Sequence, residues 1–175
     1  MLAMLGVFAC RATIVPRLSL EEMVARSETI VSGQVTRVWT AWDSPHRFIW
    51  THTEILVSNV TKGNRSGKLV VSEPGGIVDG LGMQIAGAPG YAPGEQVMLF
   101  LERMPNGYLR TAGMGQGKLS LSPDGRVHLT HAGADLASRA IPSHRTPLQS
   151  LDAADANEVR RRVAILVSGA SVRAR

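Results

Sequence analysis

The chain has 175 residues, of which 44% are hydrophobic and 5% are aromatic. This length suits one domain with a continuous core and is short for two, and the hydrophobic content excludes a wholly disordered chain. The net charge of +5, from 19 basic and 14 acidic residues, suits an anionic partner but is also ordinary for solubility. The single cysteine, Cys10, excludes an intramolecular disulfide and a multi-cysteine zinc site.

The N-terminal segment is apolar without a break from Met1 to Ala9. This run is too short to span a bilayer, which needs about 20 apolar residues. It matches the apolar part of a secretory signal whose positively charged start is missing. We interpret residues 1–12 as a truncated signal, which predicts a periplasmic or secreted protein without a transmembrane span. Two alternatives stay open: Met1 begins a short strand of a cytosolic protein, or Cys10 carries the lipid of a bacterial lipoprotein.

A short helix is predicted after Leu18. Ser19 can cap it, and Glu22 can reach back to the Ser19 amide, which makes a capping box. Leu20 and Met23 begin the apolar stripe of a helix of about two turns, which must pack on another element.

Four segments rich in β-branched and aliphatic residues predict strands: 29–39, 48–60, 68–72 and 97–101. The last of them is five apolar residues between turn residues and charges, which is typical of a strand buried on both faces. In the second strand, alternation places Trp50 and His52 on one face, and Thr51 and Thr53 on the other.

A Gly- and Pro-rich segment, 73–95, separates the third and fourth strands. Loops of over about 20 residues are rare in compact domains unless they are functional. The apolar residues of this loop, which include Ile77, Leu81 and Ile85, predict that it packs down on the domain. A short strand is expected near residues 83–85.

Turn residues and a helical pattern complete the chain. Asn106-Gly107 and Pro123-Asp124-Gly125 predict hairpins. Residues 133–150 show no periodicity and are interpreted as a linker. Helical spacing predicts a C-terminal helix at 151–168 that packs on the preceding domain, followed by a tail at 169–175.

This order of elements favours a mainly β fold. We predict that residues 13–132 form a small antiparallel barrel of the oligonucleotide/oligosaccharide-binding (OB) type, flanked by a short N-terminal helix and a C-terminal helix. A β-sandwich is the alternative.

Motifs for cofactor or nucleophilic chemistry fail on their residues. Gly113–Lys118 resembles a phosphate-binding loop, but Ala112 stands where the first glycine belongs and Leu119 where Ser or Thr would hold magnesium. His128 and His131 fall on opposite faces of a strand, which does not suit a shared metal. No nucleophile elbow is present. We therefore expect no enzyme, no cofactor and no metal.

Three functional hypotheses follow. The first is an exported, non-catalytic binding module whose partner is a protein or polysaccharide outside the cytoplasm. The second is a hydrolase that uses carboxylates such as Glu73, Asp79, Glu95 and Glu102. The third, which the modest charge disfavours, is a single-stranded nucleic-acid-binding barrel, and it requires arginines and tryptophans on one face.

The first strand pair and the long loop together form the expected contact surface, because rigid scaffolds usually bind through such loops. Its candidate residues are Trp39, Trp42, Trp50, His52, Glu73, Asp79 and Tyr91.

Short motifs spread over residues 13–167 carry a further signal. They are 18–22, 30–35, 49–51, 62–63, 74–76, 87–89, 93–95, 99–101 and 115–118. Together they resemble a family of exported bacterial proteins of uncharacterised function. The resemblance implies a domain preceded by a signal peptide, and it brings no catalytic residues.

The early helix, the strand beginning at 30–35 and the Lys62-Gly63 turn also resemble the netrin-like module of tissue inhibitors of metalloproteinases. That resemblance implies an OB-type barrel. Those inhibitors act through a disulfide-pinned N-terminal cysteine. Because Cys10 has no partner cysteine, the inhibitory mechanism is not carried over.

Overall fold

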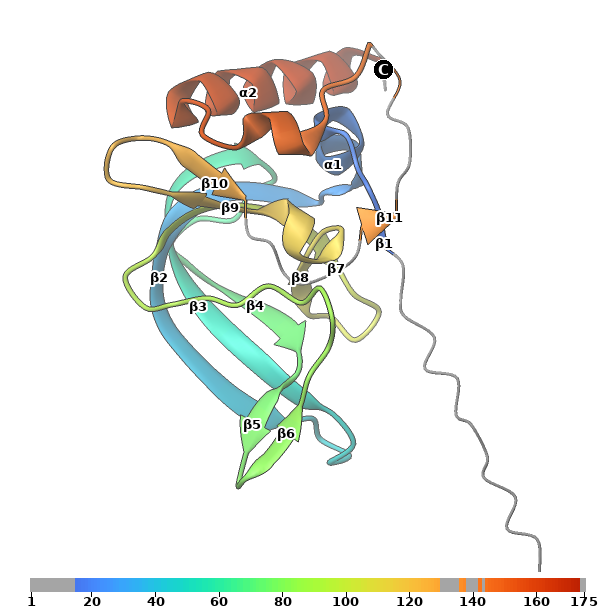
Figure 1. Ribbon diagram of the computed structural model, residues 1–175, viewed down its shortest axis with the longest axis vertical. Coiled ribbons are helices and arrows are strands. Elements are labelled where there is room, and N and C mark those ends of the chain that lie inside the picture. The colour runs from blue at the N-terminus through green and yellow to red at the C-terminus, as the bar shows by residue number, and fades with distance from the viewer. Residues whose placement is uncertain (1–14, 130–135, 138–141, 143, 174–175) are drawn as a thin grey trace, which may run out of the picture.

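The computed structural model describes residues 15–129, 136–137, 142 and 144–173 (Figure 1). The predicted signal segment 1–12, including Cys10, lies outside the described residues, as does most of the predicted linker before residue 144. Within the described part of the chain, no helix is both long enough and apolar enough to cross a membrane.

Five strands close into a barrel: β2 (Thr29–Trp42), β3 (Ile49–Lys62), β4 (Lys68–Pro74), β7 (Gln96–Arg103) and β8 (Leu109–Thr111). The order around the ring is β2-β3-β4-β8-β7, and β7 pairs with β2 to close it. Every pairing is antiparallel except β4–β8, which is parallel at Val71 and Leu109. This connectivity is that of an OB-type barrel. The predicted barrel is therefore confirmed over the alternative sandwich.

Six smaller elements surround the barrel: β1 (Val15–Pro16), β9 (Lys118–Leu121), β10 (Val127–Leu129), β11 (Leu136–Ala137), and the 3₁₀ turns η1 (Met114–Gly117) and η2 (Leu148–Leu151). Strands β9 and β10 extend the sheet beyond β7 and form the hairpin predicted at Pro123–Gly125, and β1 pairs with β11. Leu148 and Leu151 are buried, so the end of the predicted linker belongs to the core.

The predicted N-terminal helix is α1 (Leu20–Arg26), and its capping box is confirmed. The Ser19 hydroxyl accepts a hydrogen bond from the Glu22 amide (3.2 Å), and the Glu22 carboxylate accepts one from the Ser19 amide (2.9 Å). The C-terminal helix, α2 (Ala156–Arg173), begins later than residue 151 and continues into the predicted tail. The later start follows from Asp155, whose carboxylate accepts hydrogen bonds from the first-turn amides.

Two cores share strand β7, whose predicted burial on both faces is confirmed. Met98 and Phe100 pack in the core between the barrel and the helices, while Val97, Leu99 and Leu101 fill the barrel interior. A strand between two apolar layers needs apolar residues at every position, which accounts for the unbroken run.

The first part of the long loop forms a hairpin that projects from the barrel. It consists of β5 (Gly76–Val78) and β6 (Leu81–Met83), and it lies at the end of β2 and β3, away from α1 and α2 (Figure 1). Ile77 and Leu81 are 68% and 60% exposed, so the expected packing of these side chains is wrong. The hairpin is attached through its backbone. Thr40 donates to the Ile77 carbonyl (2.6 Å), and Thr51 donates to the Gly75 carbonyl (2.8 Å).

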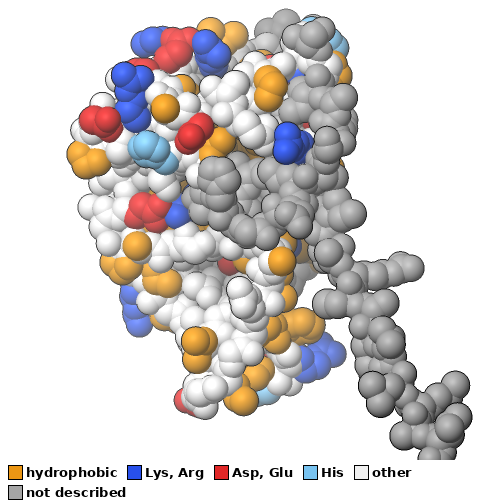
Figure 2. All heavy atoms as spheres, in the orientation of Figure 1, with side chains coloured by type: hydrophobic (Ala, Val, Ile, Leu, Met, Phe, Trp, Pro, Cys, Tyr) orange, Lys and Arg blue, Asp and Glu red, His pale blue; other side chains and the backbone are white. Residues whose placement is uncertain are grey.

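Figure 2 shows hydrophobic side chains at this lower end of the molecule and also on its left side and at its top. The later part of the loop is held more deeply. Tyr91 packs against the barrel core, and the buried ammonium of Lys118 lies 4.7 Å from its ring. Lys118 also donates to the Gly90 carbonyl (2.6 Å).

Candidate functional site

The outer face of β2, β3 and β4 carries a row of polar and aromatic side chains. Trp39 on β2 lies opposite His52 on β3, and His52 lies opposite Ser72 on β4. The ring centroids of Trp39 and His52 are 5.3 Å apart. One step along the strands, Trp50 faces outward opposite Ala41. The predicted alternation of the second strand is thus confirmed, since Thr53 on the other face is buried.

A register shift in β2 sets which of its residues face outward. The pairing with β3 is irregular between Val35 and Arg37. Val35 is buried in the barrel, whereas Arg37 and Trp39 follow on the outer face. The guanidinium carbon of Arg37 lies 5.0 Å from the Trp39 ring, which is a cation–π distance. One extra residue in β2 therefore places the side chains of Arg37 and Trp39 on the same outer face.

The fourth ring comes from the turn between β7 and β8. The Tyr108 ring lies edge-on to Trp50 (centroids 5.0 Å apart, 76° between planes) and to His52 (5.6 Å, 87°). Sequence reasoning missed Tyr108 as a site residue. The Asn106-Gly107 signal predicted the turn that carries it, but the contact needs the barrel to close. We call Trp39, Trp50, His52 and Tyr108 the aromatic cluster.

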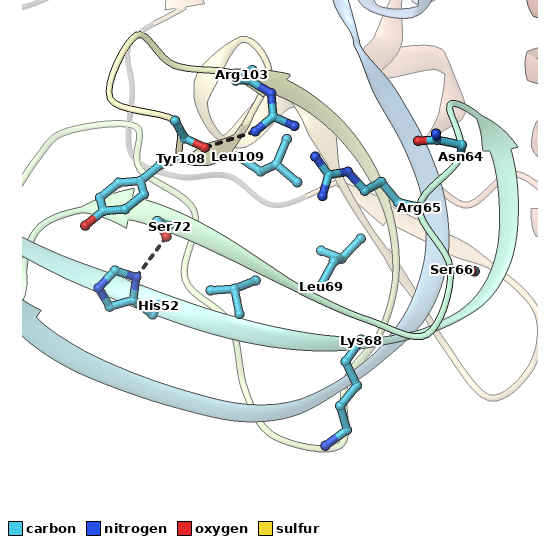
Figure 3. Close-up of a pocket in the computed structure, with 12 residues that line it drawn as sticks. His52, Asn64, Arg65, Ser66, Lys68, Leu69, Ser72, Arg103, Tyr108 and Leu109 are labelled. Atoms are coloured by element: carbon cyan, nitrogen blue, oxygen red, sulfur yellow. Dashed lines mark hydrogen bonds between the residues drawn. The ribbon is translucent and has the colours of Figure 1, made fainter.

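A surface groove of about 490 Å³ begins beside the aromatic cluster (Figure 3). Its walls come from β3, β4, the β3–β4 turn and the β7–β8 turn. The residues that line the groove include His52, Asn64, Arg65, Ser66, Ser72, Arg103 and Tyr108.

His52 is fixed in this groove by a hydrogen bond between its Nδ1 and the Ser72 hydroxyl (2.8 Å), drawn as a dashed line in Figure 3. Burial lowers the pKa of His52 below its ordinary value, so the imidazole is neutral at pH 7. A serine beside a histidine also resembles a nucleophile and its base. The His52 ring contacts Trp39 and Tyr108, and within the described residues no carboxylate is hydrogen-bonded to the imidazole. We therefore interpret the hydrogen bond between His52 and Ser72 as a contact that positions the His52 ring.

The far end of the groove is basic. The guanidinium groups of Arg65, from the β3–β4 turn, and Arg103, from β7, point toward each other above Leu109 (Figure 3). Both act on Glu28: Arg103 pairs with it at 2.7 Å, and the hydrogen bond from Arg103 and then the charges of both arginines lower the pKa of Glu28. Arg103 is thus paired with Glu28, whereas Arg65 acts on that carboxylate only through its charge. Lys68 points away from the groove and pairs with Glu54 at 3.0 Å.

Of the candidate contact residues, the structure brings Trp39, Trp50 and His52 together. Trp42 lies on the opposite face of β2 from Trp39, because the register is regular over the residues between them. Its ring stacks on His46 (centroids 5.9 Å apart) instead. Asp79 is exposed at the turn of the β5–β6 hairpin. Tyr91 packs against the barrel core, and its hydroxyl lies 2.6 Å from the Thr111 hydroxyl.

Glu73 is not on the contact surface, so that prediction is wrong. Its position on β4 follows Ser72, and alternation turns its side chain into the barrel, where it is 1% exposed. One carboxylate oxygen accepts the Thr111 amide (2.7 Å), and the other lies 3.4 Å from Arg110 Nε. Burial raises the pKa of Glu73 to about 7, and the guanidinium of Arg110 only partly offsets this.

The carboxylates do not form the open pair that the hydrolase hypothesis needs. Glu73 does not line the groove beside the aromatic cluster. Glu95 is bound by Lys118 (2.7 Å) and Ser120 (2.6 Å); burial raises its pKa, but these hydrogen bonds outweigh burial and hold it below its ordinary value. Glu102 pairs with Arg26.

Two groups of arginines lie in different places. Arg37, Arg65 and Arg103 lie on the side of the barrel that carries Trp39 and Trp50. The C-terminal arginines 160–162 lie on α2 instead. Among the described residues, no group of three or more His, Cys, Asp or Glu side chains is arranged to hold a metal ion.

A comparison of the chain with models of protein families finds no match, and a search of curated proteins finds no similar sequence. The resemblances to an exported bacterial family and to the netrin-like module therefore stay predictions.

Proposed function

We propose that this protein is an exported, non-catalytic binding module whose contact surface is the outer face of β2, β3 and β4. One observation carries the proposal: four rings from three segments gather on an exposed face, directly beside a groove. Aromatic side chains supply large contact areas at low entropic cost and dominate binding surfaces. OB-type barrels bind their ligands on this part of the barrel.

The absence of catalysis is part of the proposal, and the positions of the polar groups support it. The buried Glu73 is closed off from solvent, and Glu95 is engaged by Lys118 and Ser120. The His52–Ser72 pair fixes a ring of the aromatic cluster. These side chains hold the surface in shape.

The contact surface is tested by NMR, because the protein has three tryptophans and two lie in the aromatic cluster. Oligosaccharides, peptides and oligonucleotides are titrated into ¹⁵N-labelled protein. We expect a ligand to shift the indole N–H signals of Trp39 and Trp50 and leave that of Trp42, which lies on the other face of β2. Shifts confined to Trp42, to α2 or to the β5–β6 hairpin would place binding elsewhere and refute the proposal.

Export is tested separately by cell fractionation after expression from an extended upstream start. A periplasmic or secreted product whose N-terminal mass begins near Thr13 supports export. A cytosolic product that retains Met1 contradicts it.

A further inference from the structure

We infer that the ligand of this surface is an acidic polysaccharide, whose sugar rings lie on the aromatic cluster and whose anionic groups are bound by Arg65 and Arg103. This inference rests on the proposed function and adds the chemical class of the ligand. It depends on three observations: the charge at the far end of the groove, the geometry of the rings, and the polar groups between them.

The charge is the first observation. Arg65 and Arg103 point toward each other, and Glu28 is the carboxylate that both act on. Glu28 is paired with Arg103, so the neighbouring guanidinium of Arg65 leaves a local positive charge. A carboxylate or sulfate of the ligand would neutralise it, and guanidinium groups bind such oxyanions through paired hydrogen bonds. The Arg103 side chain is 37% exposed, so a ligand can reach it.

The density of charge separates a polysaccharide from a nucleic acid. A single strand of nucleic acid carries a phosphate at every nucleotide and needs a groove that is basic along its length. Here Glu28 and Glu54 stand among the cations, paired with Arg103 and Lys68. These carboxylates would repel closely spaced phosphates. A glycan with one acidic group in each pair of sugars can place its charge at Arg65 and keep its neutral sugars beside Glu28 and Glu54.

The ring geometry is the second observation. Tyr108 stands nearly perpendicular to Trp50 and to His52, with 76° and 87° between the planes. Such rings do not form the parallel platforms on which successive bases stack. They form an angled apolar surface, which suits the C–H face of a sugar ring.

The polar groups of the groove are the third observation. Asn64 and Ser66 are exposed and line it with neutral donors and acceptors, while the buried Ser72 hydroxyl is bonded to His52. The pKa of His52 is lowered by burial, which keeps that ring neutral. Neutral groups of this kind can both donate to and accept from hydroxyls. A ligand rich in hydroxyl groups would satisfy them.

The test compares four probes: a hyaluronan oligosaccharide, which has one carboxylate in each pair of sugars; the same oligosaccharide with its carboxyl groups reduced to alcohols, as the neutral probe; a keratan sulfate oligosaccharide, as the sulfated probe; and oligothymidylate. Binding is measured by calorimetry and by tryptophan fluorescence. We expect an acidic glycan to bind at least about tenfold more tightly than the neutral one, the effect of losing a hydrogen bond to a charged group. The two acidic probes show whether carboxylate or sulfate is preferred.

Matched variants locate the binding. Trp50→Ala and Arg65→Gln should each weaken the acidic probe about tenfold, the effect of a central contact residue. Trp42→Ala, on the other face, and Arg160→Gln, on α2, should leave it unchanged. Thermal unfolding of each variant shows whether it is folded, and loss of affinity in a folded Arg65→Gln protein supports the inference.

Several outcomes overturn the inference and leave the proposed function intact. These are equal binding of neutral and acidic glycans, preference for oligothymidylate, or tight binding that Arg65→Gln does not change. Failure of all four probes also overturns it. The proposed function fails on a different result. It fails if a ligand shifts NMR signals elsewhere in the protein but leaves the indole signals of Trp39 and Trp50 unchanged.

Discussion

Replacing the buried carboxyl of Glu73 should remove a pH dependence from the stability of the fold. Glu73→Gln keeps the size of the side chain and its acceptor for the Thr111 amide, but it cannot ionise. At pH 4 Glu73 is protonated in the folded protein and mostly protonated in the unfolded chain, so the variant and the wild type should be similarly stable. At pH 8 the wild type holds a buried charge next to Arg110, and the variant should be the more stable protein.

The magnitude follows from the pKa. In the folded protein the pKa of Glu73 is about 7, against an ordinary value of 4.5. Between these values the folded state retains a proton that the unfolded chain has released, so raising the pH favours unfolding. The penalty is absent below pH 4.5, grows as the pH rises, and is complete above pH 7. Each tenfold change in the ionisation constant is worth about 1.4 kcal/mol, which gives a full penalty of about 3 kcal/mol.

Urea unfolding across this pH range measures the difference. We expect the free energy of unfolding of Glu73→Gln minus that of the wild type to rise from near zero to about 3 kcal/mol. Glu95→Gln is the matched control with the opposite sign. The folded-state pKa of Glu95 lies below its ordinary value, so its stabilisation is present above that ordinary value and is lost as the pH falls. Parallel pH curves for Glu73→Gln and the wild type would show that Glu73 is ionised normally.

Three further substitutions test the packing. Gly33→Ala would put a Cβ 2.4 Å from the Leu56 carbonyl oxygen and should destabilise the barrel by about 2 kcal/mol, whereas Gly90→Ala meets no atom within 4 Å and should be neutral in the same urea unfolding. Ser19→Ala removes the capping box and should lower the free energy of unfolding by about 1 kcal/mol, measured by thermal unfolding. An unchanged free energy of unfolding would show that the cap does not stabilise the fold. Lys118→Met leaves a partly buried carboxylate without its cation and should cost about 3 kcal/mol, with faster amide exchange in the loop before β7. Unchanged exchange would mean that other contacts hold that loop.

Local sequence patterns predicted the elements whose cause is local. The Ser19–Glu22 capping box depends on residues three apart, and the apolar run of β7 reports burial on both faces directly. The Asn106-Gly107 turn likewise needs only a residue that accepts a positive φ, which Gly107 has. These features were confirmed because no distant part of the chain decides them.

The β5–β6 hairpin shows where this reasoning fails. Apolar residues such as Ile77 and Leu81 were expected to pack down, since apolar side chains usually leave water. The hairpin is fixed instead by Thr40 and Thr51, which donate to its backbone carbonyls. Once the backbone is held in that way, alternation along a short strand decides which side chains face the solvent. Nothing in the composition of the loop reveals that choice.

The candidate site was only half visible in the sequence for a related reason. Trp39, Trp50 and His52 lie on neighbouring strands joined by one turn, so their proximity follows from local pairing. Tyr108 and Arg103 reach the same face only because β8 pairs with β4 and closes the barrel. The pairing of β4 with β8 consists of one parallel pair of residues, Val71 and Leu109, and no sequence motif predicts it. The groove is thus a product of topology, and the residues that complete it could be recognised only after the ring of strands was known.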